Sequence, residues 1–258
     1  MRQRPDSIAA NIAHWTKNNR DRLDGEARPE TWAEGDLRWG IFGIRESDLG
    51  SPLGDVRGLD VVELGCGTAY FSARLAKRGA RCVGVDPTPA QLDTARRMQD
   101  ATGIRFPLVE APGERVPLPD AAFDLAFSEY GASLWADPKL WLPEAARLLR
   151  PRGRLVFMTN SLIVNLTMPD RSEDVVTESL QRPLKDLYRV EWADEIGVEF
   201  HPSHAEWIDL LHVAGFEVER LIDVYARPES RRHDFYGYVS PEWARKWPAE
   251  EIWTARKR

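Results

Sequence analysis

The chain has 258 residues, of which 43% are hydrophobic and 29% are charged, a balance typical of a globular protein with its own core. Forty-one acidic residues against thirty-five basic ones give a net charge of −6, which argues against a general nucleic-acid binder, whose surface would be basic. The two cysteines, Cys66 and Cys82, exclude a disulfide scaffold and favour a reducing, cytoplasmic location.

The N-terminal part of the chain differs in texture from the rest. Residues 1–55 are polar with scattered aromatic side chains, and Ser7 is predicted to cap a short amphipathic helix. We expect this segment to form a helical and aromatic cap on a single domain, residues 56–258. The chain begins without the apolar core of a secretory signal. No stretch reaches the roughly 18 apolar residues that span a membrane, so we expect no membrane contact.

From residue 59 onward, short apolar runs alternate with helical patterns. The predicted strands are residues 59–64, 81–85, 105–109, 123–128, 155–159, 216–225 and 251–255. The predicted helices are residues 69–78, 89–102, 139–149 and 204–214. This alternation predicts an α/β fold with a doubly wound, mostly parallel, seven-stranded sheet. The irregular residues 160–200 follow the fifth strand, and an insertion of this length is typical of a lid or a wall of a binding pocket.

The first strand ends in a glycine turn, Gly65-Cys66-Gly67, that leads directly into the first helix. Two glycines allow a tight turn and a close approach of backbone to ligand. Asp86 ends the second strand, nineteen residues after Gly67 (86 − 67), where an acid can accept both hydroxyls of a ribose. A dinucleotide site needs a small residue where Tyr70 stands, so the pattern favours S-adenosyl-L-methionine, which has a ribose and a small carboxylate end.

Five segments, in this order, are similar to the motifs of class I S-adenosylmethionine-dependent methyltransferases: residues 62–76, 84–87, 114–124, 148–157 and 214–216. The resemblance covers about residues 58–225. It implies a Rossmann-like methyltransferase fold, S-adenosyl-L-methionine as cofactor and S-adenosyl-L-homocysteine as product.

The resemblance also implies which residues hold the cofactor. The glycine turn would face the methionine part, and Asp86 would hold the ribose. The implied cofactor residues are Glu63, Gly65, Cys66, Gly67, Tyr70, Asp86, Pro87, Gln91, Gly113, Glu114 and Ser128. Pro112 departs from the family, because many relatives carry an acid there that accepts from the adenine amino group. Either Glu110 or Glu114 replaces that acid, or backbone groups alone contact the adenine.

Methyl transfer requires an acceptor held in line and shielded from water, and a base only where the acceptor must lose a proton. The candidate catalytic residues are His201, His14, Glu129 and Tyr130, with His201 the first choice as base. The candidates for the acceptor pocket are His14, Trp15, Trp39, Tyr130, Trp135, His201 and His204. No cysteine and histidine spacing predicts a metal site, and Glu129 with Asp137 would supply only half of a Mg²⁺ site.

Small-molecule acceptors are favoured over macromolecules. The segment Ser128-Glu129-Tyr130-Gly131 lacks the paired prolines of nucleic-acid amino methyltransferases, and Glu129 has no second glutamate before residue 144, unlike the protein-arginine enzymes. We therefore expect a small-molecule partner, no nucleic acid, and a monomer or homodimer. The alternatives are a methyltransferase of tRNA or rRNA, a non-catalytic S-adenosylmethionine-binding protein, and a nicotinamide oxidoreductase with a degenerate turn.

Overall fold

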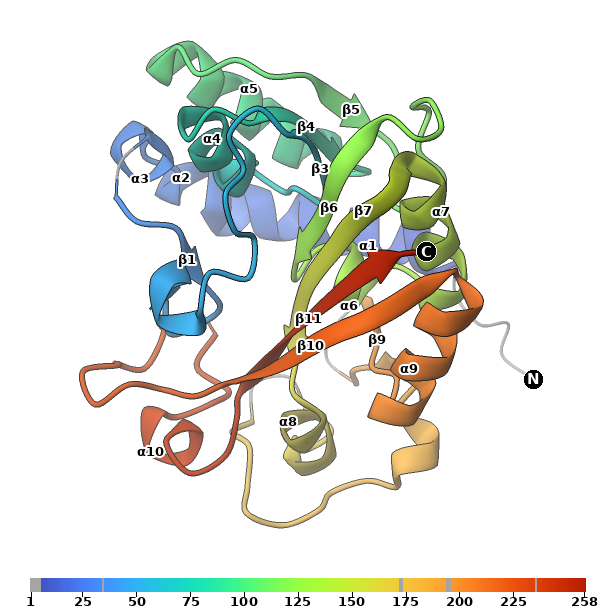
Figure 1. Ribbon diagram of the computed structural model, residues 1–258. Helices are drawn as coiled ribbons and strands as arrows, with labels where there is room; N and C mark the ends of the chain where they lie inside the picture. Colours follow the sequence, from blue (N-terminus) through green and yellow to red (C-terminus); the bar gives the residue numbers. More distant parts are fainter. Residues whose placement is uncertain (1–5, 34, 172–173, 194–195, 235) are drawn as a thin grey trace.

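The structure is a computed structural model that describes residues 6–33, 35–171, 174–193, 196–234 and 236–258. Its central feature is a seven-stranded sheet (Figure 1). The strands are β3 (Asp60–Leu64), β4 (Arg81–Asp86), β5 (Leu108–Glu110), β6 (Phe123–Glu129), β7 (Leu149–Asn160), β10 (Phe216–Val224) and β11 (Glu250–Lys257). They lie in the order β10-β11-β7-β6-β3-β4-β5. The neighbours from β7 to β5 pair in parallel, whereas β11 is antiparallel to both β7 and β10. The predicted mostly parallel, seven-stranded α/β fold is confirmed.

Helices cover both faces of the sheet. In chain order they are α1 (Ser7–Asn18), α2 (Asp24–Glu26), α3 (Pro29–Ala33), α4 (Tyr70–Lys77), α5 (Pro89–Thr102), α6 (Ala132–Trp135), α7 (Pro138–Leu148), α8 (Leu162–Thr167), α9 (His204–Val213) and α10 (Pro241–Ala244). Shorter elements are a π-helical turn (Asn19–Leu23), two 3-10 turns (Glu46–Leu49 and Leu184–Asp186) and the strands β1 (Arg38–Trp39), β2 (Ile44–Arg45), β8 (Arg189–Glu191) and β9 (Val198–Phe200).

The two faces of the sheet carry separate apolar cores, because successive side chains of a strand point to opposite faces. Val61 of β3 packs with Phe71 of α4 and Leu92 of α5 on one face. Its neighbour Val62 packs with Trp141 of α7 on the other face, where α9 also lies. Figure 1 shows α4 and α5 on one side of the sheet and α7 and α9 on the other. This layering leaves the loops at the carboxyl ends of the strands free for a site.

The N-termini of α1 and α9 can be compared with the predicted caps. Helix α1 begins one residue after its cap, which is Asp6 rather than the predicted Ser7, since the Asp6 carboxylate accepts from the N–H of Ile8. Ser203 caps α9 as predicted and forms a complete capping box with Glu206. Local side-chain chemistry therefore fixes both starts, and a carboxylate prevails over a neighbouring hydroxyl in α1.

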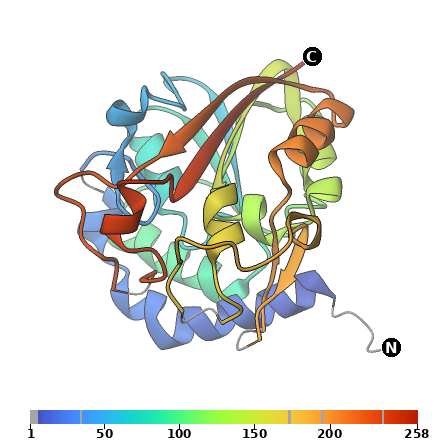
Figure 2. The ribbon, with the colours of Figure 1, turned by 90° about the horizontal axis from the view of Figure 1, so that it is seen from below.

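The N-terminal helix and the insertion lie together across the ends of the strands. In Figure 2, α1 and β9 lie side by side, and the two elements are in contact. The buried Asn11 amide links them, because it donates to the carbonyl oxygens of Trp135 (2.7 Å) and Val198 (2.9 Å) and accepts from the Val198 N–H (2.7 Å). Helix α1 and strand β9, far apart in sequence, are thus joined into one layer. Within the described ranges, no helix has the length and apolarity needed to cross a membrane.

Candidate active site

The glycine turn after β3 packs directly against the loop after β6. Gly65 has a φ of +77°, a backbone conformation that favours glycine. A Cβ atom at Gly65 would lie 2.5 Å from both the Ala132 nitrogen and the Gly131 Cα, closer than real atoms approach. The contact holds the turn against the carboxyl end of the neighbouring strand, where a ligand of such a sheet binds.

Asp86, the last residue of β4, closes the same crevice. Its two carboxylate oxygens accept from the backbone N–H groups of Gly67 and Thr88, each at 2.8 Å. Burial raises the pKa of Asp86, and these hydrogen bonds oppose the rise. Because each oxygen has a second lone pair, the carboxylate can still accept from hydroxyl groups in the crevice.

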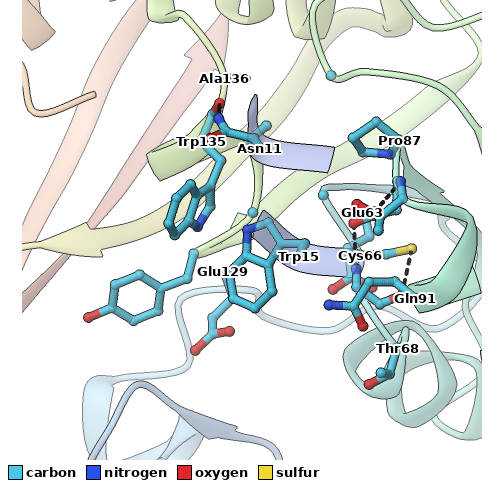
Figure 3. A pocket seen from close by; sticks show the side chains of 18 of the residues that line it. Asn11, Trp15, Glu63, Cys66, Thr68, Pro87, Gln91, Glu129, Trp135 and Ala136 are labelled. Carbon is cyan, nitrogen blue, oxygen red and sulfur yellow. Dashed lines mark hydrogen bonds between the residues drawn. The ribbon is translucent and has the colours of Figure 1, made fainter. Parts of the chain in front are cut away.

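A cavity of about 260 Å³ opens between these groups. Ten of the eleven predicted cofactor residues line it: Glu63, Gly65, Cys66, Gly67, Tyr70, Asp86, Pro87, Gln91, Gly113 and Glu114. Figure 3 shows Glu63, Cys66 and Gln91 on one side of this cavity and Trp15, Trp135 and Glu129 on the other. We call it the crevice cavity.

Ser128 is the predicted cofactor residue that lies elsewhere. It is fully buried, and its hydroxyl donates to the Leu64 carbonyl oxygen (2.7 Å) and accepts from the Ser133 N–H (3.1 Å). Successive side chains of β6 point to opposite faces, so Glu129 reaches the cavity and Ser128 does not. Ser128 braces β6 against β3, and the expectation that it faces the ligand is corrected.

Two buried groups, Glu63 of β3 and Cys66 of the turn, have raised pKa values. Burial raises the pKa of Glu63 to about 8, against hydrogen bonds from the N–H (3.0 Å) and the hydroxyl of Ser72. Burial also raises the pKa of the Cys66 thiol well above its usual range. Cys66 is therefore a neutral, apolar part of the wall rather than a nucleophile.

The structure also bears on which acid could contact the adenine in place of the one missing at Pro112. Pro112, Gly113 and Glu114 line the crevice cavity, whereas Glu110 is exposed and lies outside it. Glu114 accepts from the Asp137 N–H at 3.2 Å, and burial raises its pKa. Glu114 is accordingly the acid that can reach a ligand there.

A second cavity, of about 540 Å³, adjoins the first. Its lining residues are His14, Trp15, Asn18, Gly40, Ile41, Tyr70, Glu129, Tyr130, Leu134, Trp135, Asn160, Met168, Trp192, Glu199, His233, Tyr236 and Tyr238. The residues that line both cavities are Trp15, Tyr70, Glu129, Tyr130, Trp135 and Tyr236. The two cavities thus meet at a ring of aromatic side chains that includes one carboxylate.

That carboxylate belongs to Glu129, the last residue of β6. One oxygen accepts from the Gly40 N–H at 3.1 Å, and burial raises the pKa of Glu129 to about 7. A carboxylate with a pKa near 7 at the junction of two cavities is suited to accept a proton at neutral pH.

Tyr130 lies beside Glu129 and is held by a buried polar network. Its φ is +52°, and its hydroxyl lies 2.8 Å from Glu250 Oε1 and 3.0 Å from Asn160 Oδ1. Burial raises the pKa of Glu250 to about 7, and its Oε2 atom has no hydrogen-bond partner among the described residues. The network fixes the Tyr130 ring at the wall of both cavities.

Of the two histidines predicted as catalytic, His14 lines a cavity and His201 does not. His14 lines the second cavity, its ring stacks on Trp135 with centroids 5.0 Å apart, and burial lowers its pKa. His201 is buried outside both cavities, with Nε2 2.7 Å from Glu199 Oε2. The expectation that His201 faces the acceptor is corrected, because Glu199 stands between it and the cavity.

Of the other residues predicted for the acceptor pocket, some line the second cavity and some do not. Trp15, Tyr130 and Trp135 line the second cavity, as expected. Trp39 is buried in the core with its indole N–H donating to Glu46, and His204 is half-exposed with Nε2 2.7 Å from Glu251 Oε2. Neither lines a cavity.

Several residues that line the cavities belong to no sequence motif and are not among the predicted site residues. Asn11, Trp192, Glu199, His233, Tyr236 and Tyr238 line one of the cavities or both. They come from α1, the insertion and the loop after β10. In the described part of the chain, no three His, Cys, Asp or Glu side chains cluster as metal ligands would. Asp137 instead caps α7 and accepts from the Tyr188 hydroxyl at 2.6 Å.

Part of the chain is similar to known methyltransferases. A family profile described as "Methyltransferase domain" matches residues 62–157. A malonyl-[acyl-carrier protein] O-methyltransferase of Serratia marcescens is 38% identical over 102 residues, 40% of this chain and 38% of the relative. The chain spans less than two-thirds of the curated relatives that it matches, 36% to 54% of their length in those compared.

Solved structures match over a longer range. An S-adenosylmethionine-dependent methyltransferase from Mesorhizobium loti is 25% identical with a TM-score of 0.65, and the match covers 84% of this chain and all (100%) of that one. A Burkholderia thailandensis 1,6-didemethyltoxoflavin-N1-methyltransferase with bound S-adenosylhomocysteine has a TM-score of 0.60 at 17% identity, covering 100% and 92% of the two chains. Through its glycine turn, its ribose-type acid and the domain that carries them, the chain is similar to the class I S-adenosylmethionine-dependent methyltransferases.

Proposed function

We propose that the protein transfers a methyl group from S-adenosyl-L-methionine to an O, N or C atom of a small molecule held in the second cavity. The observation that carries this proposal is that a crevice with a ribose-type acid opens directly onto a second, aromatic-walled cavity. We call this second cavity the acceptor cavity. An acceptor there would lie next to the cofactor and out of bulk water, as direct displacement requires.

The residues of the crevice cavity fit the cofactor. The Asp86 carboxylate faces the crevice with lone pairs that can accept the ribose hydroxyls. Gly113 and Glu114 would contact the adenine, and the turn at Gly65 and Gly67 would contact the methionine part. When bound, S-adenosyl-L-methionine supplies a methyl group on a positively charged sulfur.

Glu129 and Tyr130 would act where the cavities meet. With a pKa of about 7, Glu129 can take a proton from an acceptor that must lose one. The Tyr130 ring, fixed through its hydroxyl, would orient the acceptor. His14 would contact the acceptor from α1 and, because burial lowers its pKa, is a second group able to accept a proton.

The flanking segments would enclose the acceptor. We propose that residues 1–55 form a cap and residues 160–200 a lid on the domain 56–258, because α1 and β9 both contribute lining residues. We also propose that the protein is a monomer or a homodimer in the cytoplasm. The acceptor cavity has no Lys or Arg among its described lining residues, which disfavours an RNA acceptor.

The test has two stages. Titration with S-adenosyl-L-homocysteine, with NAD as the comparison, should show binding of the first alone. The protein is then incubated with methyl-labelled S-adenosyl-L-methionine and a cell extract separated into metabolites and RNA. Label in a small metabolite is the expected result. Label in RNA would support the RNA alternative, and binding without transfer would indicate a non-catalytic member.

A further inference from the structure

The acceptor cavity carries acidic side chains that no Lys or Arg side chain balances within its described lining. Glu129 and Glu199 line it, and none of its described lining residues is Lys or Arg. Its two histidines do not offset the carboxylates, because burial is the main cause that lowers the pKa of both His14 and His233. A buried carboxylate without a positive partner is costly, so this cavity favours a ligand that brings a positive charge.

Glu199 is the carboxylate that the cofactor does not explain. It lies on β9 and is buried. It lines only the acceptor cavity, whereas Glu129 lines both cavities. The buried His201 ring, 2.7 Å away, holds one of its oxygens in place. His201 is therefore a positioning residue for Glu199.

The Arg182 guanidinium, which interacts electrostatically with Glu199, lies outside the lining of the cavity. Arg182 is centred 4.7 Å from the Trp192 ring, and it donates to the carbonyl oxygens of Met168 and Pro169, each at 2.7 Å. It also contacts the exposed Asp170 at 3.3 Å. Arg182 does not line the acceptor cavity, so it leaves Glu199 available to a ligand there.

Aromatic rings form a large part of the remaining wall. The rings that line the acceptor cavity are Trp15, Tyr70, Tyr130, Trp135, Trp192, Tyr236 and Tyr238. Burial raises the pKa of the four tyrosines, so all of these rings are neutral. The faces of neutral aromatic rings attract cations and disfavour anions.

We propose that the acceptor is an organic amine that binds as a cation, with its ammonium group on Glu199 and its body against the aromatic wall. The proposal rests on the proposed function, since it names the substrate class of the same site. Carboxylate and phosphate acceptors are disfavoured, because an anion in the cavity would be repelled by either glutamate in its ionised form. A neutral acceptor would leave Glu199 with no positive partner among the described residues that line the cavity.

The amine proposal is tested without turnover by measuring how small probe molecules bind to the protein saturated with S-adenosyl-L-homocysteine. The probes are matched sets of an amine, its alcohol and its carboxylic acid, built on phenyl, indole and cyclohexyl groups. Quenching of tryptophan fluorescence reports occupancy, because Trp15, Trp135 and Trp192 line the cavity. In at least one set we expect the amine to bind about tenfold or more tightly than the alcohol, and the acid not to bind.

Glu199→Gln keeps the shape of the side chain and removes its charge. We expect it to reduce the preference for amine over alcohol to about twofold or less while the affinity for S-adenosyl-L-homocysteine stays unchanged, which also shows that the variant is folded. Glu191→Gln is the matched control, because Glu191 lies on the same hairpin but is exposed. It should leave the preference intact.

Three results would overturn the inference. The first is an alcohol that binds as tightly as its amine in every set. The second is no binding by any amine at millimolar concentration. The third is a Glu199→Gln protein that keeps the full preference. Failure of S-adenosyl-L-homocysteine to bind would instead refute the proposed function, so the two failures are distinguishable.

Discussion

The carboxylate of Asp86 accepts a hydrogen bond of 2.8 Å from the backbone N–H of Gly67. The bond joins the end of β4 to the turn after β3, because these strands pair in parallel with Leu64 opposite Val85. The ribose-type acid and the glycine turn are thereby held in one geometry before any ligand binds. Preorganisation of this kind lowers the entropic cost of binding.

Asp86→Ala should weaken the binding of S-adenosyl-L-homocysteine by roughly 10- to 1,000-fold, because two charge-assisted hydrogen bonds to the ribose are lost. Isothermal titration calorimetry measures the change. Glu110→Ala is the control, since Glu110 ends the adjacent strand but is exposed and lies outside the crevice cavity. Equal affinities of the Asp86 variant and the unmodified protein would show that the ribose binds elsewhere.

Gly65→Ala should destabilise the fold more than Gly103→Ala. Both glycines have positive φ, +77° and +73°, so both substitutions cost about 1–2 kcal/mol of backbone strain. Only at Gly65 would the new Cβ also overlap backbone, 2.5 Å from the Ala132 nitrogen, while at Gly103 nothing lies within 4 Å. We expect roughly 1–3 kcal/mol of additional loss in urea unfolding at Gly65. Equal losses would mean that the loop after β6 moves aside without cost.

Glu129 should make stability depend on pH. Its pKa is about 7 in the folded protein against 4.5 for an ordinary glutamate, so the folded state binds more protons between these values. The free energy of unfolding therefore falls as the pH rises from about 4.5 to 7. Glu129→Gln should reduce this fall by on the order of 2 kcal/mol in urea unfolding between pH 5 and pH 8.

The same comparison has an internal control. Glu63 and Glu250, whose pKa values are also raised, remain in both proteins, so their contributions largely cancel in the difference. A Glu129→Gln profile that parallels the unmodified protein would show that Glu129 is ionised throughout this range.

Tyr130 and Glu250 should be energetically coupled. Tyr130→Phe removes the hydroxyl 2.8 Å from Glu250 Oε1 and leaves a buried carboxylate with fewer partners, which should cost about 1–3 kcal/mol of unfolding free energy. In a Glu250→Gln background the same change should cost less, because the group left behind is uncharged. A double-mutant cycle measures the coupling, expected at about 0.5–3 kcal/mol. Additive losses would contradict the hydrogen bond.

Much of the fold was predictable because it depends on local patterns. Apolar runs of strand length, the glycine turn and the acid at Asp86 mark the parallel sheet and its crevice, and each is a short stretch of sequence. The capping box at Ser203 likewise acts over three residues. The strand bounds were less certain, and β7 extends from Leu149 to Asn160 where only residues 155–159 were predicted. Pairing with two neighbours, β6 and β11, lengthens a strand beyond its apolar run.

The sequence by itself determined the sheet, the turn at Gly65 and Gly67, and the acid that faces them, since each follows from the preferences of adjacent residues. Only the tertiary structure decided that Glu199 lines the acceptor cavity while His201 stands behind it, and that Ser128 faces away. The acceptor cavity is assembled from α1, the insertion and the loop after β10. Long-range packing sets which of their side chains turn inward, and no local pattern records it.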